Sequence, residues 1–181
     1  MIQLTESVID GALSRVETGL RRYCWIQENV HARDVTQDYE FQNKFNAFYK
    51  VRRGSEWRRH FYTLLESSKA DGITFADALH ILLEETSKLE ASFASKLVAT
   101  LHPEKPVIDR HVLRNFGLRL PSGTDREHHC VACYERLCEN YSALLKSAEG
   151  AMILRKFNSL FAWPKITDMK KLDLVLWQIR L

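Results

Sequence analysis

Residues 92–118 read SFASKLVATLHPEKPVIDRHVLRNFGL, and this stretch predicts two helices joined by a proline-bounded linker. Its first part places apolar residues on one helical face, at Phe93, Ala94, Leu97, Val98 and Leu101. Pro103 and Pro106 end this helix and hold the linker extended. A second helical face follows at Ile108, Val112 and Phe116. Gly117 ends the second helix, and Asp109 lies at or near its N-terminus.

The same helical spacing recurs along nearly the whole chain, without any alternating strand pattern or internal repeat. We therefore predict an all-α fold, a compact bundle of about eight to nine helices. Residues 1–37 form an added N-terminal helix that packs on a domain spanning residues 38–181. Gly54 separates two of the helices, and Gly150 interrupts a long C-terminal stripe. The expected helix N-caps are Ser55, Thr74 and Thr167.

Composition narrows the class of protein but does not name a partner. The chain has 181 residues, 45% of them apolar, so we expect a compact fold with a real core. The net charge of +3 is too small to identify a ligand. The N-terminus carries acidic residues, unlike a signal peptide, and no apolar run approaches the length of a membrane span. We expect an intracellular, cytoplasmic protein in a reducing compartment.

Asp109 supports two interpretations at this point. In the first, its carboxylate only caps a helix by accepting backbone N–H bonds. In the second, the same helix N-terminus favours the ionised carboxylate, which then faces a positive charge that develops during a reaction. Basic residues one turn onward, Arg110, His111 and Arg114, fit either interpretation.

The segment Val107-Ile108-Asp109-Arg110-His111-Val112, followed by Arg114 and Gly117-Leu118, resembles the helix-hairpin-helix DNA glycosylases of the endonuclease III type. Their signature is a hairpin, a helix and a linker ending in V-D-T-H-V. The resemblance covers about residues 38–181, and the aspartate segment is its specific part. It implies a two-lobed helical fold with a hairpin before Asp109, and it implies that Asp109 is the catalytic aspartate. No metal, organic cofactor or iron–sulfur cluster is expected.

The hairpin of this family reads like L-P-G-V-G, whereas this chain has Thr86-Ser87-Lys88-Leu89-Glu90-Ala91 there, without glycine. We expect Ser87 and Lys88 to contact a DNA phosphate. Lyase members carry a lysine after the hairpin, at a position that falls near Ala91. Lys88 and Lys96 are displaced candidates for that catalytic lysine, so we expect a monofunctional enzyme.

A second candidate region runs from Tyr49 to His60, where five basic residues are interleaved with two aromatic residues. Its arginines Arg52, Arg53 and Arg58 are candidates for DNA binding, and Tyr49 and Trp57 are candidates for a base pocket. The alternative is a solvated helix face with Trp57 in the core, and both interpretations remain open. The basic segment 165–180 likewise fits either a DNA-backbone contact or a solvated face.

Cys130 and Cys133 have the spacing of two zinc ligands, with His128 or His129 as a third. No second pair of ligands occurs elsewhere in the chain, and Cys130 fits an apolar stripe. Buried thiols that behave as small hydrophobes are therefore favoured over a metal site.

These features lead to the hypothesis of a DNA glycosylase that binds double-stranded DNA, extrudes a damaged or modified base and hydrolyses its N-glycosidic bond with the help of Asp109. The DNA contacts are assigned to Arg52, Arg53, Arg58, Ser87, Lys88, Arg110, His111 and Arg114. An oxidised purine, an alkylated base and a modified cytosine of invading phage DNA all remain open as targets. The alternatives are a non-catalytic DNA-binding protein of the same fold and an all-α protein-interaction domain.

Overall fold

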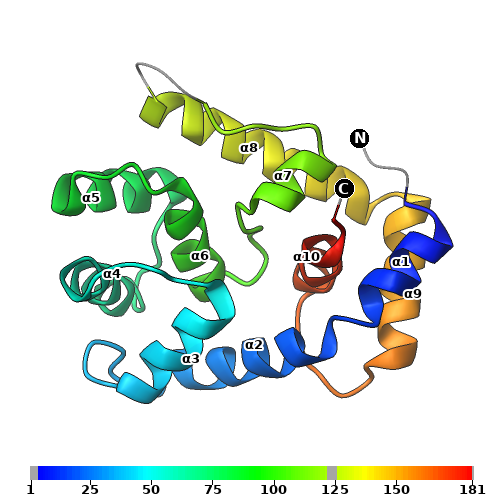
Figure 1. The fold of residues 1–181 in the computed structure, drawn as a ribbon, viewed down its shortest axis with the longest axis horizontal. Helices are drawn as coiled ribbons and strands as arrows, with labels where there is room; N and C mark the ends of the chain where they lie inside the picture. Colours follow the sequence, from blue (N-terminus) through cyan, green and yellow to red (C-terminus); the bar gives the residue numbers. More distant parts are fainter. Residues whose placement is uncertain (1–3, 122–125, 181) are drawn as a thin grey trace.

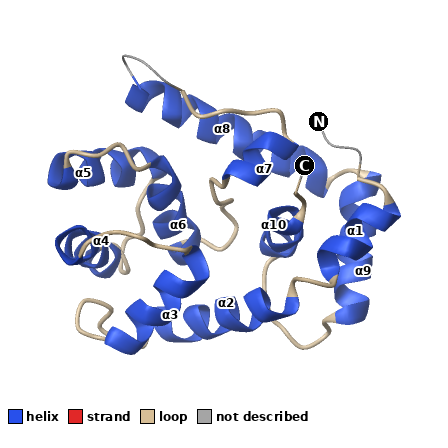
Figure 2. Cartoon of the chain, in the orientation of Figure 1, coloured by secondary structure: helices blue, strands red, loops and turns tan. Residues whose placement is uncertain are grey.

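The computed structural model describes residues 4–121 and 126–180, and within these ranges the chain forms helices and no strand (Figures 1 and 2). This confirms the all-α prediction. The described helices are α1 (Glu6–Leu13), α2 (Glu17–Val30), α3 (Tyr39–Tyr49), α4 (Ser55–Ser67), α5 (Phe75–Thr86), α6 (Ala91–Leu101), α7 (Arg110–Asn115), α8 (Arg126–Leu145), α9 (Ala148–Leu160) and α10 (Asp168–Gln178).

The described residues contain ten helices rather than the expected eight to nine, and the N-terminal stripe accounts for part of the difference. The N–H groups of Arg15 and Val16 bond to the carbonyls of Ala12 and Leu13, three residues back, at 3.0 and 3.1 Å. This tighter turn ends α1 at Leu13, and α2 restarts four residues later. The apolar spacing continues across the break, because both helices face the same core.

The helices form two groups, with α3 to α6 on one side and α1, α7, α9 and α10 on the other (Figure 1). Helix α8 spans both groups, because it packs against α5 as well as α9 and α10. Helix α10 packs against α1, α7, α8 and α9 and lies at the centre of its group. Helix α2 packs against α3 and runs along one edge of the molecule toward α1. Buried side chains from both groups belong to one continuous core, so the groups share a hydrophobic interior.

Helix α1 joins the group made by the C-terminal helices, because it packs against α9 and α10. Its residues Ile9 and Leu13 are fully buried in the shared core. The two ends of the described chain therefore stabilise the same half of the molecule.

Helix α3 begins after Asp38, whose carboxylate caps it by accepting the Phe41 N–H at 2.9 Å.

Three N-caps expected from the sequence are confirmed: Thr74, Asp109 and Thr167 each accept a backbone N–H from the first turn of the helix that follows. Ser55 is not a cap. Gly54 occupies that position, and Ser55 is the first residue of α4.

Gly150 does not interrupt a helix, contrary to the prediction. The break lies at Lys146 and Ser147, and Ser147 caps α9 by accepting the Gly150 N–H at 3.0 Å. A Cβ atom on Gly150 would lie 1.9 Å from the Leu144 carbonyl oxygen. Glycine is therefore required for the close approach of α8 and α9, not for a change of backbone direction.

None of the helices in residues 4–121 and 126–180 combines the length and the apolar character needed to cross a bilayer.

Candidate functional site

The linker between α6 and α7 carries Asp109, and side chains from two other helices hold its first half. The Thr167 hydroxyl, at the start of α10, donates to the Pro103 carbonyl at 2.8 Å. The Tyr134 hydroxyl, on α8, donates to the Pro106 carbonyl at 3.1 Å. The linker is not helical, so these carbonyls have no partner within a helix of their own, and side chains from α8 and the start of α10 donate to them.

Two serines of α6 hold the last residue before Asp109. The buried N–H of Ile108 donates to the Ser95 hydroxyl at 2.8 Å, and the Ser92 hydroxyl donates to the Ile108 carbonyl at 2.8 Å. Both backbone groups of Ile108 are thus satisfied by side chains, as a buried segment outside a helix requires. The position of Asp109 is consequently fixed from α6.

Asp109 caps α7, and the cap uses one of its two carboxylate oxygens. Oδ1 accepts the N–H of His111 at 2.7 Å. Within the described residues no hydrogen bond reaches Oδ2, and the side chain is only half-buried. The capping role is therefore real, and it leaves one carboxylate oxygen available.

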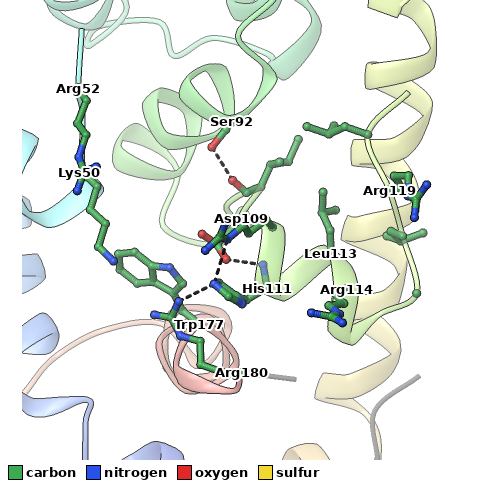
Figure 3. A pocket seen from close by; sticks show the side chains of 15 residues that line it. Lys50, Arg52, Ser92, Asp109, His111, Leu113, Arg114, Arg119, Trp177 and Arg180 are labelled. Atoms are coloured by element: carbon green, nitrogen blue, oxygen red, sulfur yellow. Dashed lines mark hydrogen bonds between the residues drawn. The ribbon is translucent and has the colours of Figure 1, made fainter. Parts of the chain in front are cut away.

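Asp109 lies in a hollow of about 1020 Å³ between α7, the end of α10 and the segment after α3 (Figure 3). Six of the residues that line it are basic: Lys50, Arg52, Arg110, Arg114, Arg119 and Arg180. All six are exposed, and Asp109 is the one acidic residue among the described residues of the lining. Such a hollow attracts an anionic ligand and places a single carboxylate against it.

The six cations reach the hollow from separate segments of the chain. Lys50 and Arg52 follow α3, on the opposite side of the hollow from Arg119, which follows α7 (Figure 3). Arg180 follows α10. Lys50 holds a left-handed backbone conformation, with φ of 54°, as the C-cap of α3. A lysine in this region of backbone space is uncommon, and here it ends α3 at the edge of the hollow.

His111 contacts two of the arginines that line the hollow. Its Nε2 atom lies 2.6 Å from Arg180 Nη1, and it accepts from Arg110 Nε at 3.2 Å. Burial and the nearby Arg180 lower the pKa of His111, so the neutral ring accepts from both guanidinium groups. His111, which the sequence analysis assigned to DNA binding, thus contacts two of the arginines that line the hollow.

Trp177 is half-buried and lines the hollow together with Asp109. Its ring packs edge-to-face on Phe48, with centroids 5.4 Å apart and an interplanar angle of 87°. Lys50 Nζ lies 5.8 Å from the centre of the same ring. An aromatic surface is thus held in place beside the carboxylate.

A second, much smaller cavity adjoins the hollow and shares Asp109 and Trp177 with it. Its volume is about 10 Å³, at the lower limit of the space that one water molecule needs. The other residues that line it are Phe48, Tyr49, Lys96, Val107, Lys170 and Asp173. The predicted residues Tyr49 and Lys96 therefore meet Asp109 in this cavity.

A buried ion pair forms the far wall of the small cavity. Lys170 and Asp173 are joined at 2.8 Å, and the Tyr141 hydroxyl donates to the other carboxylate oxygen at 2.8 Å. Burial acts to lower the pKa of Lys170, but Asp173, Tyr49 and Tyr23 together raise it above its usual value. Lys170 is therefore a permanent cation in the interior.

Lys96 differs from Lys170 in its surroundings. Its ammonium group lies 4.5 Å from the centre of the Phe93 ring, and within the described residues it makes no hydrogen bond or ion pair. Burial lowers the pKa of Lys96 to about 8, against the opposing effect of the Asp109 and Glu90 carboxylates. The neutral amine is consequently more populated near physiological pH than it is for an exposed lysine, although the ammonium form still predominates.

Several predicted residues lie away from Asp109. Arg53 makes a two-point ion pair with Glu90, at 2.8 and 3.0 Å, and Arg58 lines neither the hollow nor the small cavity. Trp57 is buried, with its ring stacked on Phe61 at 5.4 Å and against Phe93 at 4.7 Å. The structure does not bring Arg53, Arg58 or Trp57 to the aspartate, and Arg53 and Trp57 are held by partners within their own half of the molecule.

The predicted hairpin lies between α5 and α6, and Ser87 occupies the left-handed position, with φ of 53°, that ends α5. Glycine favours this conformation, so a serine here is strained relative to glycine. Ser87 and Lys88 line a separate hollow of about 230 Å³ that Glu56, His60 and Glu85 also border. The hairpin residues thus form a second surface, distinct from the hollow at Asp109.

The cysteines do not contribute to either hollow. Cys130 and Cys133 are buried, and burial raises the pKa of both thiols. Among the residues that the structure describes, no three His, Cys, Asp or Glu side chains are grouped so that they could hold a metal ion.

Sequence reasoning did not single out Lys50, Arg119, Trp177 and Arg180 as site residues. Trp177 and Arg180 belong to the C-terminal segment, which the resemblance placed behind the site, and no local pattern distinguished them from core or solvated residues. Comparison of the chain with protein-family models, with curated proteins and with solved structures found no match.

Proposed function

We propose that this protein is a DNA glycosylase that excises a damaged or modified base from double-stranded DNA. The observation that carries the proposal is the hollow at Asp109, where one carboxylate with an uncommitted oxygen faces six exposed cations and a half-buried tryptophan. The cations suit the phosphates on either side of an extruded nucleotide. The resemblance of residues 107–118 to helix-hairpin-helix glycosylases supports the same function.

Cleavage of an N-glycosidic bond develops positive charge on the sugar ring. A carboxylate held beside the sugar stabilises that charge without reorganisation, which is the role we assign to Asp109. Hydrogen bonds from α6 to the residue before Asp109 hold the carboxylate in position during the reaction. The overall reaction is hydrolysis, and we propose a monofunctional enzyme that needs no metal or organic cofactor.

We assign the extruded base to the face of Trp177, with Tyr49 behind it in the small cavity. Base-on-aromatic stacking is worth about 1–3 kcal/mol and tolerates different bases. This assignment replaces Trp57, which is stacked inside the core. The free cysteines fit work in the reducing interior of the cell, and we propose a cytoplasmic location.

The test is release of bases from duplex oligonucleotides that carry oxidised purines, alkylated bases or modified cytosines, with wild type and Asp109→Asn compared in single-turnover assays. The asparagine keeps the cap acceptor for His111 but lacks the negative charge. We expect the variant to release base about 10²-fold more slowly or worse, with nearly unchanged DNA affinity.

Asp38→Asn is the matched control, because Asp38 also caps a helix with one carboxylate oxygen and lies outside the hollow. It should keep the wild-type rate of base release. Equal release by Asp109→Asn and wild type would refute the mechanism.

A non-catalytic DNA-binding protein is the second candidate. The hairpin favours it, because glycine is absent there and Arg53 is already paired with Glu90. In that case the wild type binds DNA in a salt-sensitive manner and releases no base from any oligonucleotide of the panel.

A further inference from the structure

Lys50 and Arg180 are the two cations of the hollow that accompany Trp177, the residue to which the extruded base is assigned. Lys50 Nζ lies 5.8 Å from the centre of the Trp177 ring. Arg180 follows Trp177 at the end of α10, and both side chains line the hollow (Figure 3). A base that stacks on this ring therefore comes within reach of the Lys50 ammonium group and lies in the field of Arg180.

Neither of these two charges is neutralised within the described residues. The Lys50 ammonium group makes no ion pair with them, and Arg180 Nη1 instead lies 2.6 Å from His111 Nε2. Burial and the nearby Arg180 lower the pKa of His111, so its neutral ring compensates none of the guanidinium charge. Asp109 is the one acid among the described residues of the lining, and its Oδ1 already accepts the His111 N–H. The surroundings of Trp177 therefore keep a net positive charge.

The tryptophan ring on its own favours a cationic guest. The face of an indole attracts cations, so a purine that is methylated on N7 and positively charged would stack well on an isolated tryptophan. A unit charge acts more strongly than the quadrupole of a ring at a similar distance. The charges of Lys50 and Arg180 therefore outweigh the preference of Trp177, and they oppose a positively charged base.

We propose that the hollow takes a neutral base, that Lys50 and Arg180 stabilise the negative charge with which this base leaves, and that cationic alkylated bases are excluded. The inference rests on the glycosylase function proposed above, and it narrows the target to the oxidised purines and the modified cytosines. Positive groups held where negative charge develops are among the largest contributions to catalysis. Asp109 and the two cations then act on opposite ends of the bond that breaks.

The step balances as a hydrolysis. The bond between the sugar C1′ and the base nitrogen breaks, and its electron pair leaves with the base as an anion. A water oxygen then bonds to C1′ and loses one proton to solvent, and the base anion takes up one proton from solvent. The net reaction consumes one water, and neither Lys50 nor Arg180 changes its protonation state. A cationic base leaves as a neutral molecule, so the two cations give its departure no assistance.

The experiment compares single-turnover base release, with enzyme in excess, from duplexes that differ only in the target base. The neutral targets are 8-oxoguanine and 5-formylcytosine, and the cationic target is 7-methylguanine. Each rate is divided by the uncatalysed rate, because 7-methylguanine also departs slowly without an enzyme. Wild type should accelerate at least one neutral base about 10²-fold more than it accelerates 7-methylguanine.

Lys50→Met and Arg180→Met test the two cations. Each should slow release of the neutral base about 10²-fold and leave release of 7-methylguanine unchanged or faster. This opposite response separates an effect on the base from a loss of structure or of DNA binding, which slows both kinds of base alike. Lys50→Arg keeps the positive charge and should keep the preference of the wild type. Thermal unfolding of each variant establishes that it is folded.

Lys146→Met is the matched control, because Lys146 is exposed just after α8 and lines neither the hollow nor the small cavity. It should keep the wild-type rates. A larger acceleration of 7-methylguanine than of either neutral base overturns the inference and leaves the glycosylase function standing. Equal slowing of neutral and cationic bases in Lys50→Met and Arg180→Met, or no slowing of either, also overturns it. No release by wild type from any oligonucleotide overturns both proposals.

Discussion

Asp109 combines a structural and a chemical role because its two carboxylate oxygens have different surroundings. Oδ1 starts α7 by accepting the His111 N–H, and Oδ2 has no partner among the described residues. A helix cap and a catalytic carboxylate favour the same ionised state, so the two roles do not conflict. The capping interpretation from the sequence is confirmed, and the catalytic one stays a proposal.

A single serine carries much of the positioning of Asp109. We expect Ser95→Ala to lower the free energy of unfolding by about 1–3 kcal/mol, because the buried Ile108 N–H loses its acceptor. Base release should also slow, by up to about 10²-fold, because the linker no longer holds the Asp109 carboxylate in its position beside the hollow. Denaturant unfolding and single-turnover base release measure the two effects.

Ser159→Ala serves as the control for Ser95→Ala. The Ser95 hydroxyl donates to the Ser92 carbonyl, three residues back. The Ser159 hydroxyl likewise donates to the Lys156 carbonyl, but this side chain is exposed. Its removal should change the free energy of unfolding by no more than about 0.5 kcal/mol. Equal stability and equal base release in the two variants would show that the bond from Ile108 to Ser95 neither stabilises the linker nor positions Asp109.

At the level of elements, local signals decided where most helices begin. Thr74, Asp109 and Thr167 are caps whose side chains bond within the next turn, so three or four residues of sequence suffice to identify them. Gly117 ends the short helix α7 in a left-handed conformation, with φ of 70°, as expected. Its cap geometry is also local, because the Leu118 N–H bonds back to the Leu113 carbonyl at 2.8 Å.

The contact between α8 and α9 gives a prediction that sequence patterns alone would not. Gly150→Ala should lower the free energy of unfolding by about 1–3 kcal/mol or more, because its Cβ would overlap the Leu144 carbonyl oxygen at 1.9 Å. Gly11→Ala, in the middle of α1, has no atom within 4 Å of the new Cβ. It should instead stabilise the protein by about 0.5–1 kcal/mol.

Urea unfolding of the two glycine variants measures both changes. Wild-type stability in Gly150→Ala would mean that α8 and α9 separate easily, and the close approach would then have no structural role.

At the scale of the whole molecule, the hollow is a surface that several segments create together. If it binds DNA, the observed binding constant should fall with salt concentration in proportion to the number of phosphates contacted. Arg52→Ala and Arg119→Ala, on opposite sides of the hollow, should each make the negative slope of log K against log salt shallower by about 1. Fluorescence anisotropy with a labelled duplex at several salt concentrations measures these slopes.

Arg155→Ala is the control for the salt experiment, because Arg155 is exposed on α9 and does not line the hollow. It should leave the slope unchanged. Equal slopes for all three variants and wild type would show that DNA binds elsewhere, and the hairpin surface at Ser87 and Lys88 would be the next candidate.

Short-range patterns in the sequence were sufficient to predict the class of fold, the position of Asp109 at a helix start and the basic residues beside it. These features depend on helical periodicity and on contacts within one or two turns, and both are visible in a short stretch of chain. Arg110 and Arg114 reach the hollow for the same reason, since they follow Asp109 on α7.

The packing of the helices, in contrast, sets which distant residues lie beside Asp109. Lys50, Trp177 and Arg180 come from the ends of α3 and α10, and the lowered pKa of Lys96 comes from the burial that the packed helices impose. Local sequence does not encode these contacts, because burial and the approach of segments depend on how all the helices pack. The same packing keeps Trp57 and Arg53 away from the aspartate, although their sequence pattern suggested otherwise.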